Sequence, residues 1–274
     1  MMRKYKFSGT FYSNDRQELQ KQVNNYIKAA EIPESVRSGF SYISPHAGYI
    51  YSGKTAGYTY KALSLNKNLE IIDTIIIIGP NHTGYGTNIA VSLQDWETPF
   101  GILKNDKELS LQISKVDEIE INETAHINEH SIEVQLPFLN FLVPDKKFCF
   151  ICMLDQSLGA SIKLSDAIIN AVKKLNRNAI IIASSDFNHY ESREICNEKD
   201  NKLIKALISL DYKKFNELII KLNDTVCGFG PITTALLFAK KLGAKKGHLL
   251  SYSNSGEETK DYSNVVAYSS LVFK

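Results

Sequence analysis

Three of the six histidines directly follow predicted buried strands. His46 comes after FSYISP, His82 after IIIIGPN and His189 after IIIASSDFN. The carboxyl ends of parallel strands meet along one edge of an α/β sheet, where ligands bind, so these imidazoles are expected to converge. One histidine in such a position is usually an ordinary polar loop residue, but three indicate a common site. Because imidazole is a common metal ligand, the pattern predicts a metal centre.

Cys227 is the thiol most readily connected with such a centre. It lies in DTVCGFGPI, just before a predicted helix whose first residue is Pro231. A helix N-terminus favours the thiolate over the thiol, and a thiolate is both a nucleophile and a metal ligand. The alternative is that Cys227 is a small buried apolar residue, as many free cysteines are.

The other cysteines and two of the histidines are assigned structural positions. Cys149 and Cys152 form CFIC within an apolar strand, where positions i and i+3 face opposite sides of the sheet, so both are expected in the core. Cys196 is expected to be an incidental thiol. His126 and His248 have no comparable context and are expected at the surface.

Two carboxylates lie near the start of a predicted helix in EHSIEVQLP. Glu129 and Glu133 are one helical turn apart. One hypothesis is that a carboxylate here accepts the free N–H of a metal-bound imidazole and so fixes its tautomer. The other is that both residues belong to a solvated helix face.

Gly48–Thr55, GYIYSGKT, matches the phosphate-binding pattern GxxxxGK[ST] between a strand and a helix, and IIIASSD resembles a Walker B strand. Against this, three residues separate the strand from Gly48, and Tyr, Ile and Tyr are bulky for a loop that wraps phosphates. Ser52 also suits a helix N-cap. A P-loop nucleotide-binding protein is therefore an alternative hypothesis.

Apolar runs rich in β-branched residues alternate with helical patterns, which is typical of a largely parallel sheet covered by helices. The predicted strands are residues 39–44, 72–79, 87–92, 147–153, 178–184, 247–253 and 264–273. The predicted helices are residues 14–30, 52–65, 106–115, 130–142, 159–175, 198–209, 211–222 and 231–242. The last two strands should form an antiparallel hairpin, and residues 80–130 an excursion over one end of the sheet. The predicted fold is an α/β three-layer sandwich with a mixed, mostly parallel sheet.

Composition narrows the functional classes. The 274 residues, 43% of them hydrophobic, can bury a sizeable core, and one domain over residues 1–274 is expected. Lys and Arg number 32 against 30 Asp and Glu, and the charges are scattered, which argues against a nucleic-acid partner. Without an apolar run of membrane length or a leader pattern, and with few cysteines, a cytoplasmic protein without a membrane partner is expected.

Six strings, in this order, resemble the Memo family, which also occurs as the Memo part of the AmmeMemoRadiSam set. They are PHAGYIYSGKTAG, IIIIGPNHTGYG, ETPFG, NEHSIEVQLPFL, IIASSDFNHY and DTVCGFGPI. GTFYSND near the start and SYSNSGE and VAYSSL near the end are also similar, so the resemblance covers nearly the whole chain. It implies a fold like that of the class III extradiol dioxygenases, which are non-haem iron enzymes.

The resemblance also implies roles for individual residues. His46, His82 and Cys227 match the family's metal-binding positions, and Asp186 and His189 match residues that line the same pocket. His189 looks like the catalytic acid/base of the dioxygenases, with Asp186 orienting it. The dioxygenases have a carboxylate ligand where this chain offers a thiolate, so Fe(II) is expected first, and Cu or Zn is chemically admissible.

The implied function is a non-haem metal-dependent oxidoreductase acting on an unknown small molecule. One alternative is covalent catalysis by Cys227 with His189 as base. Another is a phosphopeptide or protein binding module, since Memo-like proteins have been associated with phosphotyrosine peptides. Lys54 is the nearest cation to the predicted site, whereas a phosphate pocket favours arginine clusters. Radical-SAM and AMMECR-type proteins are implied as partners.

Overall fold

The computed structural model describes residues 2–274, and within them twelve strands form one mixed sheet. The strand order is β1-β5-β6-β8-β3-β9-β2-β12-β10, with β11 beside β12, β4 beside β8 and β7 beside β4. The strands are β1 (Met2–Arg3), β2 (Ser41–Ser44), β3 (Thr74–Pro80), β4 (Ile89–Val91), β5 (Asp95–Thr98), β6 (Gly101–Asn105), β7 (Ile119–Ile121), β8 (Lys147–Met153), β9 (Ala179–Ser184), β10 (His189–Glu191), β11 (Gly247–Asn254) and β12 (Val265–Phe273).

The helices connect these strands. They are α1 (Arg16–Ala29), α2 (Tyr49–Ser64), α3 (Lys107–Ile113), α4 (Thr124–Ile127), α5 (Leu136–Leu142), α6 (Leu158–Lys174), α7 (Arg193–Ile208), α8 (Tyr212–Lys221), α9 (Phe229–Lys241) and α10 (Gly256–Thr259), with single 3₁₀ turns η1 (Glu34–Val36), η2 (Leu69–Ile71) and η3 (Glu133–Gln135). Among the helices of residues 2–274, none has both the length and the apolar character needed for a membrane crossing.

The middle of the sheet is parallel. β9 pairs in parallel with β2 on one side and with β3 on the other, and β8 continues the parallel set beyond β3. β12 is antiparallel to β2 and forms a hairpin with β11. The predicted mixed, mostly parallel sheet and the predicted C-terminal hairpin are therefore confirmed.

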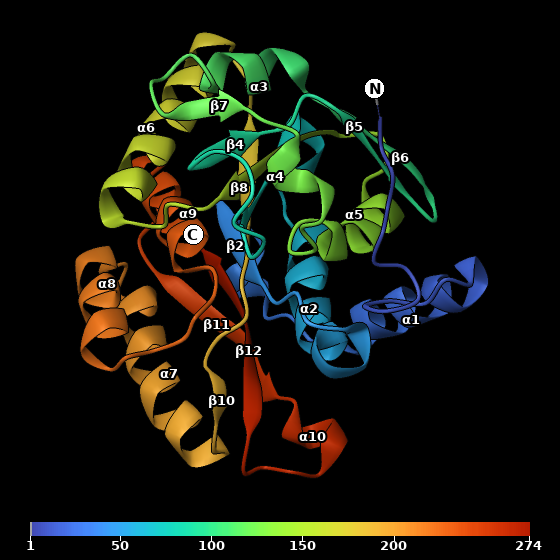
Figure 1. Cartoon of the computed structure of the whole chain (residues 1–274), viewed down its shortest axis with the longest axis vertical. Coiled ribbons are helices and arrows are strands. Elements are labelled where there is room, and N and C mark those ends of the chain that lie inside the picture. Colours follow the sequence, from blue (N-terminus) through green and yellow to red (C-terminus); the bar gives the residue numbers. More distant parts are fainter. Residues whose placement is uncertain (1) are drawn as a thin grey trace.

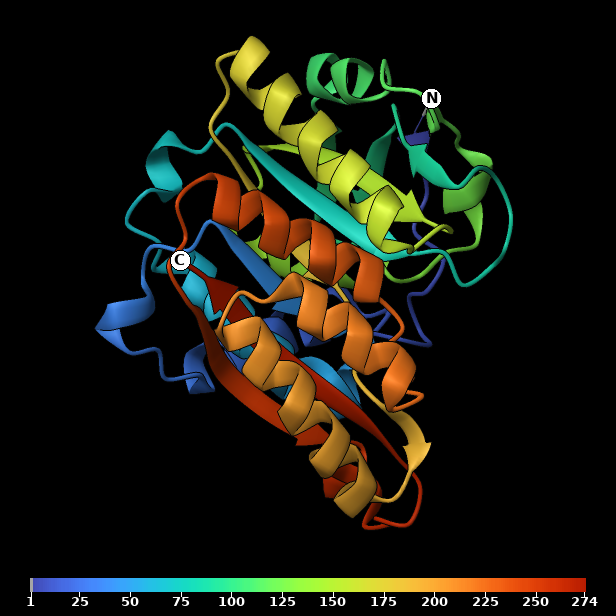
Figure 2. The same cartoon turned by 90° about the vertical axis from the view of Figure 1, so that its left-hand side faces the viewer.

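Helices cover both faces of the sheet, as Figure 1 shows with α6, α7, α8 and α9 on one side and α1, α2 and α5 on the other. Figure 2 shows the first group lying across its face. Side chains alternate along β3, so Ile76 and Ile78 join the hydrophobic cluster under α6 and α9, and Ile75 and Ile77 join the cluster under α1 and α2. This two-sided burial is the three-layer sandwich.

The structure differs from the predicted elements mainly in its short strands and in where two helices begin. Strands β1, β5, β6, β7 and β10 were not predicted, because segments of two to five residues carry too little periodicity. The excursion at residues 80–130 pairs with the sheet through β4 and β6. α7 begins at Arg193 instead of residue 198, capped by the Ser192 hydroxyl. The helix expected from residue 130 begins only with η3 and α5.

A buried carboxyl joins α7 to β11. Asp200 is fully buried, and its Oδ2 accepts a 2.6 Å hydrogen bond from the hydroxyl of Tyr252. Desolvation by burial raises the pKa of Asp200 to about 8, which the hydrogen bond from Tyr252 only partly opposes. The folded protein therefore holds a proton here that the unfolded chain releases near pH 4.

We predict that this carboxyl makes the protein less stable as pH rises. Between about pH 4 and pH 8 the folded state binds the extra proton, so the free energy of unfolding falls with increasing pH and levels off above about pH 8. Asp200→Asn stays neutral and still accepts from Tyr252. From pH 6 to pH 8, wild type should lose about 2 kcal/mol relative to this variant in urea unfolding. Parallel pH profiles would contradict the prediction.

Candidate metal centre

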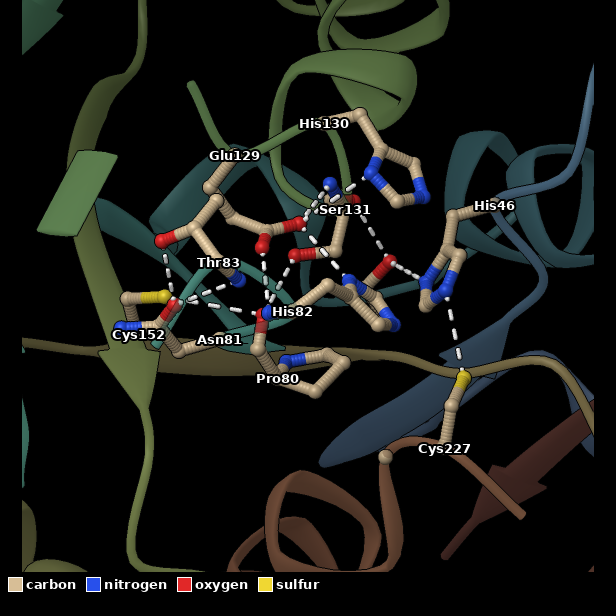
Figure 3. Close-up of polar contacts among 12 residues, drawn as sticks. His46, Pro80, Asn81, His82, Thr83, Glu129, His130, Ser131, Cys152 and Cys227 are labelled. Atoms are coloured by element: carbon tan, nitrogen blue, oxygen red, sulfur yellow. Dashed lines mark hydrogen bonds and ion pairs between the residues drawn. The ribbon is translucent and has the colours of Figure 1, made fainter. Parts of the chain in front are cut away.

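The parallel strands bring three distant segments to one edge of the sheet. The loops after β2 and β3 carry His46 and His82, and the segment before α9 carries Cys227 (Figure 3). One ligand atom from each of these residues lies within 4.8 Å of the other two. The predicted convergence of the two imidazoles and the thiol is therefore present in the structure.

Cys227 reaches β9 because the next residue is glycine. The backbone N–H of Gly228 donates to the Ser185 hydroxyl at 2.9 Å. A Cβ on Gly228 would lie 2.6 Å from the carbonyl oxygen of Ser184. Any larger residue would push the thiol away from the strand end.

Among the three candidate ligands, His46 and Cys227 are in direct contact. His46 is buried, and its Nε2 lies 3.2 Å from Cys227 Sγ. Nitrogen and sulfur ligands of one zinc-sized ion are at most about 4.4 Å apart, so this pair fits a shared cation. The other ring nitrogen, Nδ1, lies 2.9 Å from the Ser184 hydroxyl.

His82 is held by a buried carboxylate. Its Nδ1 lies 2.9 Å from Glu129 Oε1, and its backbone N–H donates to Glu129 Oε2 at 2.6 Å. An ionised carboxylate only accepts, so Nδ1 carries the hydrogen and Nε2 keeps its lone pair. This is the arrangement in which a carboxylate orients a metal-binding imidazole.

Glu129 and Glu133 are both buried, so the hypothesis of a solvated helix face is wrong. Burial by itself would raise the pKa of Glu129, but the hydrogen bonds from His82 and Ser131 and the neighbouring imidazoles lower it to about 2. Glu133 has a different role. It binds Arg3 at 2.7 Å and accepts from Tyr12, which fixes the N-terminal segment.

The Cys227 thiol is not activated by the helix N-terminus alone. Burial raises its pKa well above the ordinary value, because desolvation penalises the thiolate, and the nearby Asp186 carboxylate adds to the effect. The effect expected from the start of α9 is therefore outweighed by burial. A coordinated cation deprotonates a thiol outright, so a thiolate here goes with a bound metal.

Asp186 and His189 line the same pocket as the three candidate ligands, but they do not bind each other. Asp186 accepts from the backbone N–H of His46 at 2.8 Å. The Nδ1 of His189 lies 3.0 Å from the carbonyl of Thr225, so this nitrogen donates and Nε2 keeps its lone pair. The expected orientation of His189 by Asp186 is wrong, and Thr225 takes that part.

A fourth imidazole in the pocket, His130, was not predicted as a site residue. Its ring stacks on His82, with centroids 4.7 Å apart, and meets His46 edge-on at 5.3 Å. Burial lowers the pKa of His130 to about 4, so it is neutral at pH 7. It follows Glu129 in the same string, which was the available signal, but no strand precedes it and the strand-end criterion missed it.

The pocket has a volume of about 920 Å³, and its wall combines aromatic rings, imidazoles and small polar side chains. The aromatic rings are those of Phe11, Tyr51, Tyr190 and Tyr268. Within residues 2–274, no lysine or arginine lines the pocket.

The remaining cysteines and histidines have mixed outcomes. Cys149 and Cys152 lie in the clusters on opposite faces of the sheet, as predicted, and Cys196 is buried. His248 is half-buried on β11. The surface position expected for His126 is wrong, because it packs fully buried against Trp96 and burial lowers its pKa to about 3.

The alternative prediction of a phosphate-binding loop at Gly48–Thr55 is also wrong. α2 begins at Tyr49 with Gly48 as its cap, so nearly all of Gly48–Thr55 is helix and its amides cannot wrap a phosphate. Ser52 is not the cap, and its hydroxyl donates to the carbonyl of Ala47. Lys54 is exposed and pairs with Glu258 at 2.8 Å.

Comparison with known proteins gives a full-length match. A family model described as "Memo-like protein" matches residues 3–272. A MEMO1 family protein of Methanococcus maripaludis is 40% identical over 97% of this chain and 98% of its own length. MEMO1 family proteins of Methanosarcina barkeri and Nitrosopumilus maritimus are each 39% identical, over 99% and 100% of both chains respectively.

Glu129→Gln should destabilise the metal-free protein by about 2 kcal/mol, measured by urea unfolding at pH 7 in the presence of a chelator. Both carboxylate oxygens accept N–H groups, so an amide NH₂ in place of either one faces another donor. As the matched control, Glu198→Gln changes an exposed helical carboxylate that pairs with Lys202 and should leave the unfolding curve unchanged. Equal stability of the two variants would refute this role of Glu129.

Proposed function

Because this chain belongs to the Memo-like family, we propose that it is a metal-binding protein with its centre at His46, His82 and Cys227. We further propose that it acts as a non-haem metal-dependent oxidoreductase related to the class III extradiol dioxygenases. The observation that carries the proposal is the donor set, in which two imidazoles and one sulfur meet at the rim of a 920 Å³ pocket. The substrate is a small molecule bound in that pocket.

The donor set suits a borderline to soft metal. Two imidazoles and a thiolate are compatible with Fe(II), Cu and Zn, and Fe(II) is the first choice because of the family's likeness to iron dioxygenases. A bound redox metal supplies electron transfer and polarises a coordinated substrate. Such a centre is softer than one with two imidazoles and a carboxylate.

The chain's own side chains provide proton transfer beside the centre. Burial lowers the pKa of His189, so it is neutral at pH 7 and its free Nε2 accepts a proton. The carbonyl of Thr225 holds the ring in this tautomer. His130 is a second neutral imidazole on the pocket wall.

The alternative functions have less support. For covalent catalysis by Cys227, the imidazole in contact with Sγ is His46 and not His189, so the expected base is not the neighbour of the thiol. For a phosphopeptide module, no cationic side chain of residues 2–274 lines the pocket. Radical-SAM and AMMECR-type partners stay predictions that rest on the resemblance to the AmmeMemoRadiSam set.

We predict that the purified protein binds one Fe(II) per chain in an anaerobic titration. Cys227→Ser and His46→Ala should each lower the affinity more than about 100-fold, because each removes a ligand atom. The measurement is metal content after gel filtration, together with the binding isotherm.

Two variants serve as controls. Cys196→Ser changes a buried thiol on α7, and His248→Ala changes a histidine on β11, so both should bind Fe(II) as wild type does. Retention of stoichiometric metal by Cys227→Ser would sink the proposed centre. Binding of a phosphotyrosine peptide that survives His46→Ala would favour the binding module instead.

A further inference from the structure

The hydroxyl of Ser184, at the end of β9, has three polar neighbours. Its Oγ lies 2.6 Å from the carbonyl of Ser131, 2.8 Å from Nε2 of Gln135 and 2.9 Å from Nδ1 of His46. All four residues are at least 98% buried. The three protein partners match the one hydrogen and two lone pairs of the hydroxyl.

The direction of each bond follows from groups that have only one role. A backbone carbonyl only accepts, so the Ser184 hydrogen points to Ser131. An amide NH₂ only donates, so one lone pair of Ser184 takes the hydrogen of Gln135. The contact with His46 then has only a lone pair on the Ser184 side, so Nδ1 of His46 carries the hydrogen.

The orientation of the Gln135 amide is itself fixed by a carbonyl. Nε2 donates to the carbonyl of Pro45 at 2.9 Å, and Oε1 accepts from the hydroxyl of Tyr60 at 2.5 Å. A flipped amide would set its oxygen against the Pro45 carbonyl. Two backbone carbonyls, those of Pro45 and Ser131, therefore determine the whole chain of bonds.

We propose that Ser184 and Gln135 are positioning residues that hold His46 as its Nδ1–H tautomer. In this tautomer the lone pair of Nε2 faces Cys227 Sγ, 3.2 Å away, before any metal arrives. The benefit for metal binding rests on the proposed function. The tautomer itself is a property of the metal-free protein, so it can be measured separately.

The two imidazoles of the centre are thus held by different devices. Glu129 presents a negative charge to His82, whereas Ser184 presents a neutral hydroxyl to His46. A carboxylate partner makes the imidazole a more basic metal ligand, and a neutral hydroxyl partner has a smaller effect. The Ser184 chain therefore sets the tautomer of His46 without adding a second charge beside a buried ring.

The first test is the tautomer of metal-free wild type, from long-range ¹H–¹⁵N NMR of its labelled histidines in the presence of a chelator. His46 should show a protonated Nδ1 and an unprotonated Nε2. His46 found protonated at Nε2 would overturn the proposal, and this result needs no variant.

The second test is a titration with Co²⁺ alone, followed by the thiolate-to-cobalt absorption band. Ser184→Ala should raise the fraction of His46 that carries its hydrogen on Nε2 and weaken Co²⁺ binding by about 10–100-fold. Ser184→Thr keeps a hydroxyl and should restore both the tautomer and the affinity. Gln135→Met should weaken binding less than Ser184→Ala, because it leaves the Ser184 hydroxyl in place.

Ser41→Ala is the matched control. Ser41 is a fully buried serine at the start of β2, the end of that strand away from His46. Its hydroxyl donates to the carbonyl of Ala235 at 2.8 Å. Its loss removes one buried hydrogen bond instead of three, so it should lower the melting temperature less than Ser184→Ala and leave the tautomer and the Co²⁺ affinity unchanged. An equal loss of Co²⁺ affinity in both variants would reduce Ser184 to a structural residue.

The outcomes separate this inference from the proposed function. If wild type binds no metal but His46 changes tautomer in Ser184→Ala, the positioning role stands and the metal function fails. If wild type binds Co²⁺ but the tautomer is the same in Ser184→Ala, the positioning role fails and the metal function stands.

Discussion

The parallel pairing of β9 with both β2 and β3 is the constraint on which the rest of the structure depends. Ile181 is in register with Ser41 on one side and with Ile76 on the other, so the three strands end at the same rim. The loops after β2 and β3 each carry a histidine near their start, and His189 follows the loop after β9 as the first residue of β10. A slip in this register would separate the candidate ligands and also turn the strand side chains to the wrong face.

Around that rim the protein buries many polar groups and few net charges. Glu129 keeps its charge because it accepts several N–H groups and lies beside two imidazoles, whereas burial raises the pKa of Asp186 to about 7. The imidazoles of His46 and His130 are held neutral by burial. Neutral imidazoles repel an incoming cation less than charged ones, and the single strong negative charge lies behind His82.

The sequence alone predicted the layers of the fold and the convergence of His46 and His82, because both follow from rules of strand order and helix alternation. The place of Cys227 beside them was implied by the resemblance to the Memo family. The sequence could not predict the short edge strands, because they are fixed by pairing with strands that are distant in the sequence. It also missed His130, since no strand end marks it. Thr225 and Ser184 orient His189 and His46 through individual hydrogen bonds. Which donor faces which acceptor cannot be read from the spacing of residues along a chain.

The burial of the thiols described above has a consequence for oxidative damage. Three of the four cysteines are sealed in the core, and only Cys227 borders the pocket. Peroxides and alkylating reagents attack thiolates far faster than thiols. Burial raises the pKa of all four thiols, so the metal-free protein keeps its sulfur in the protonated form that such reagents attack slowly.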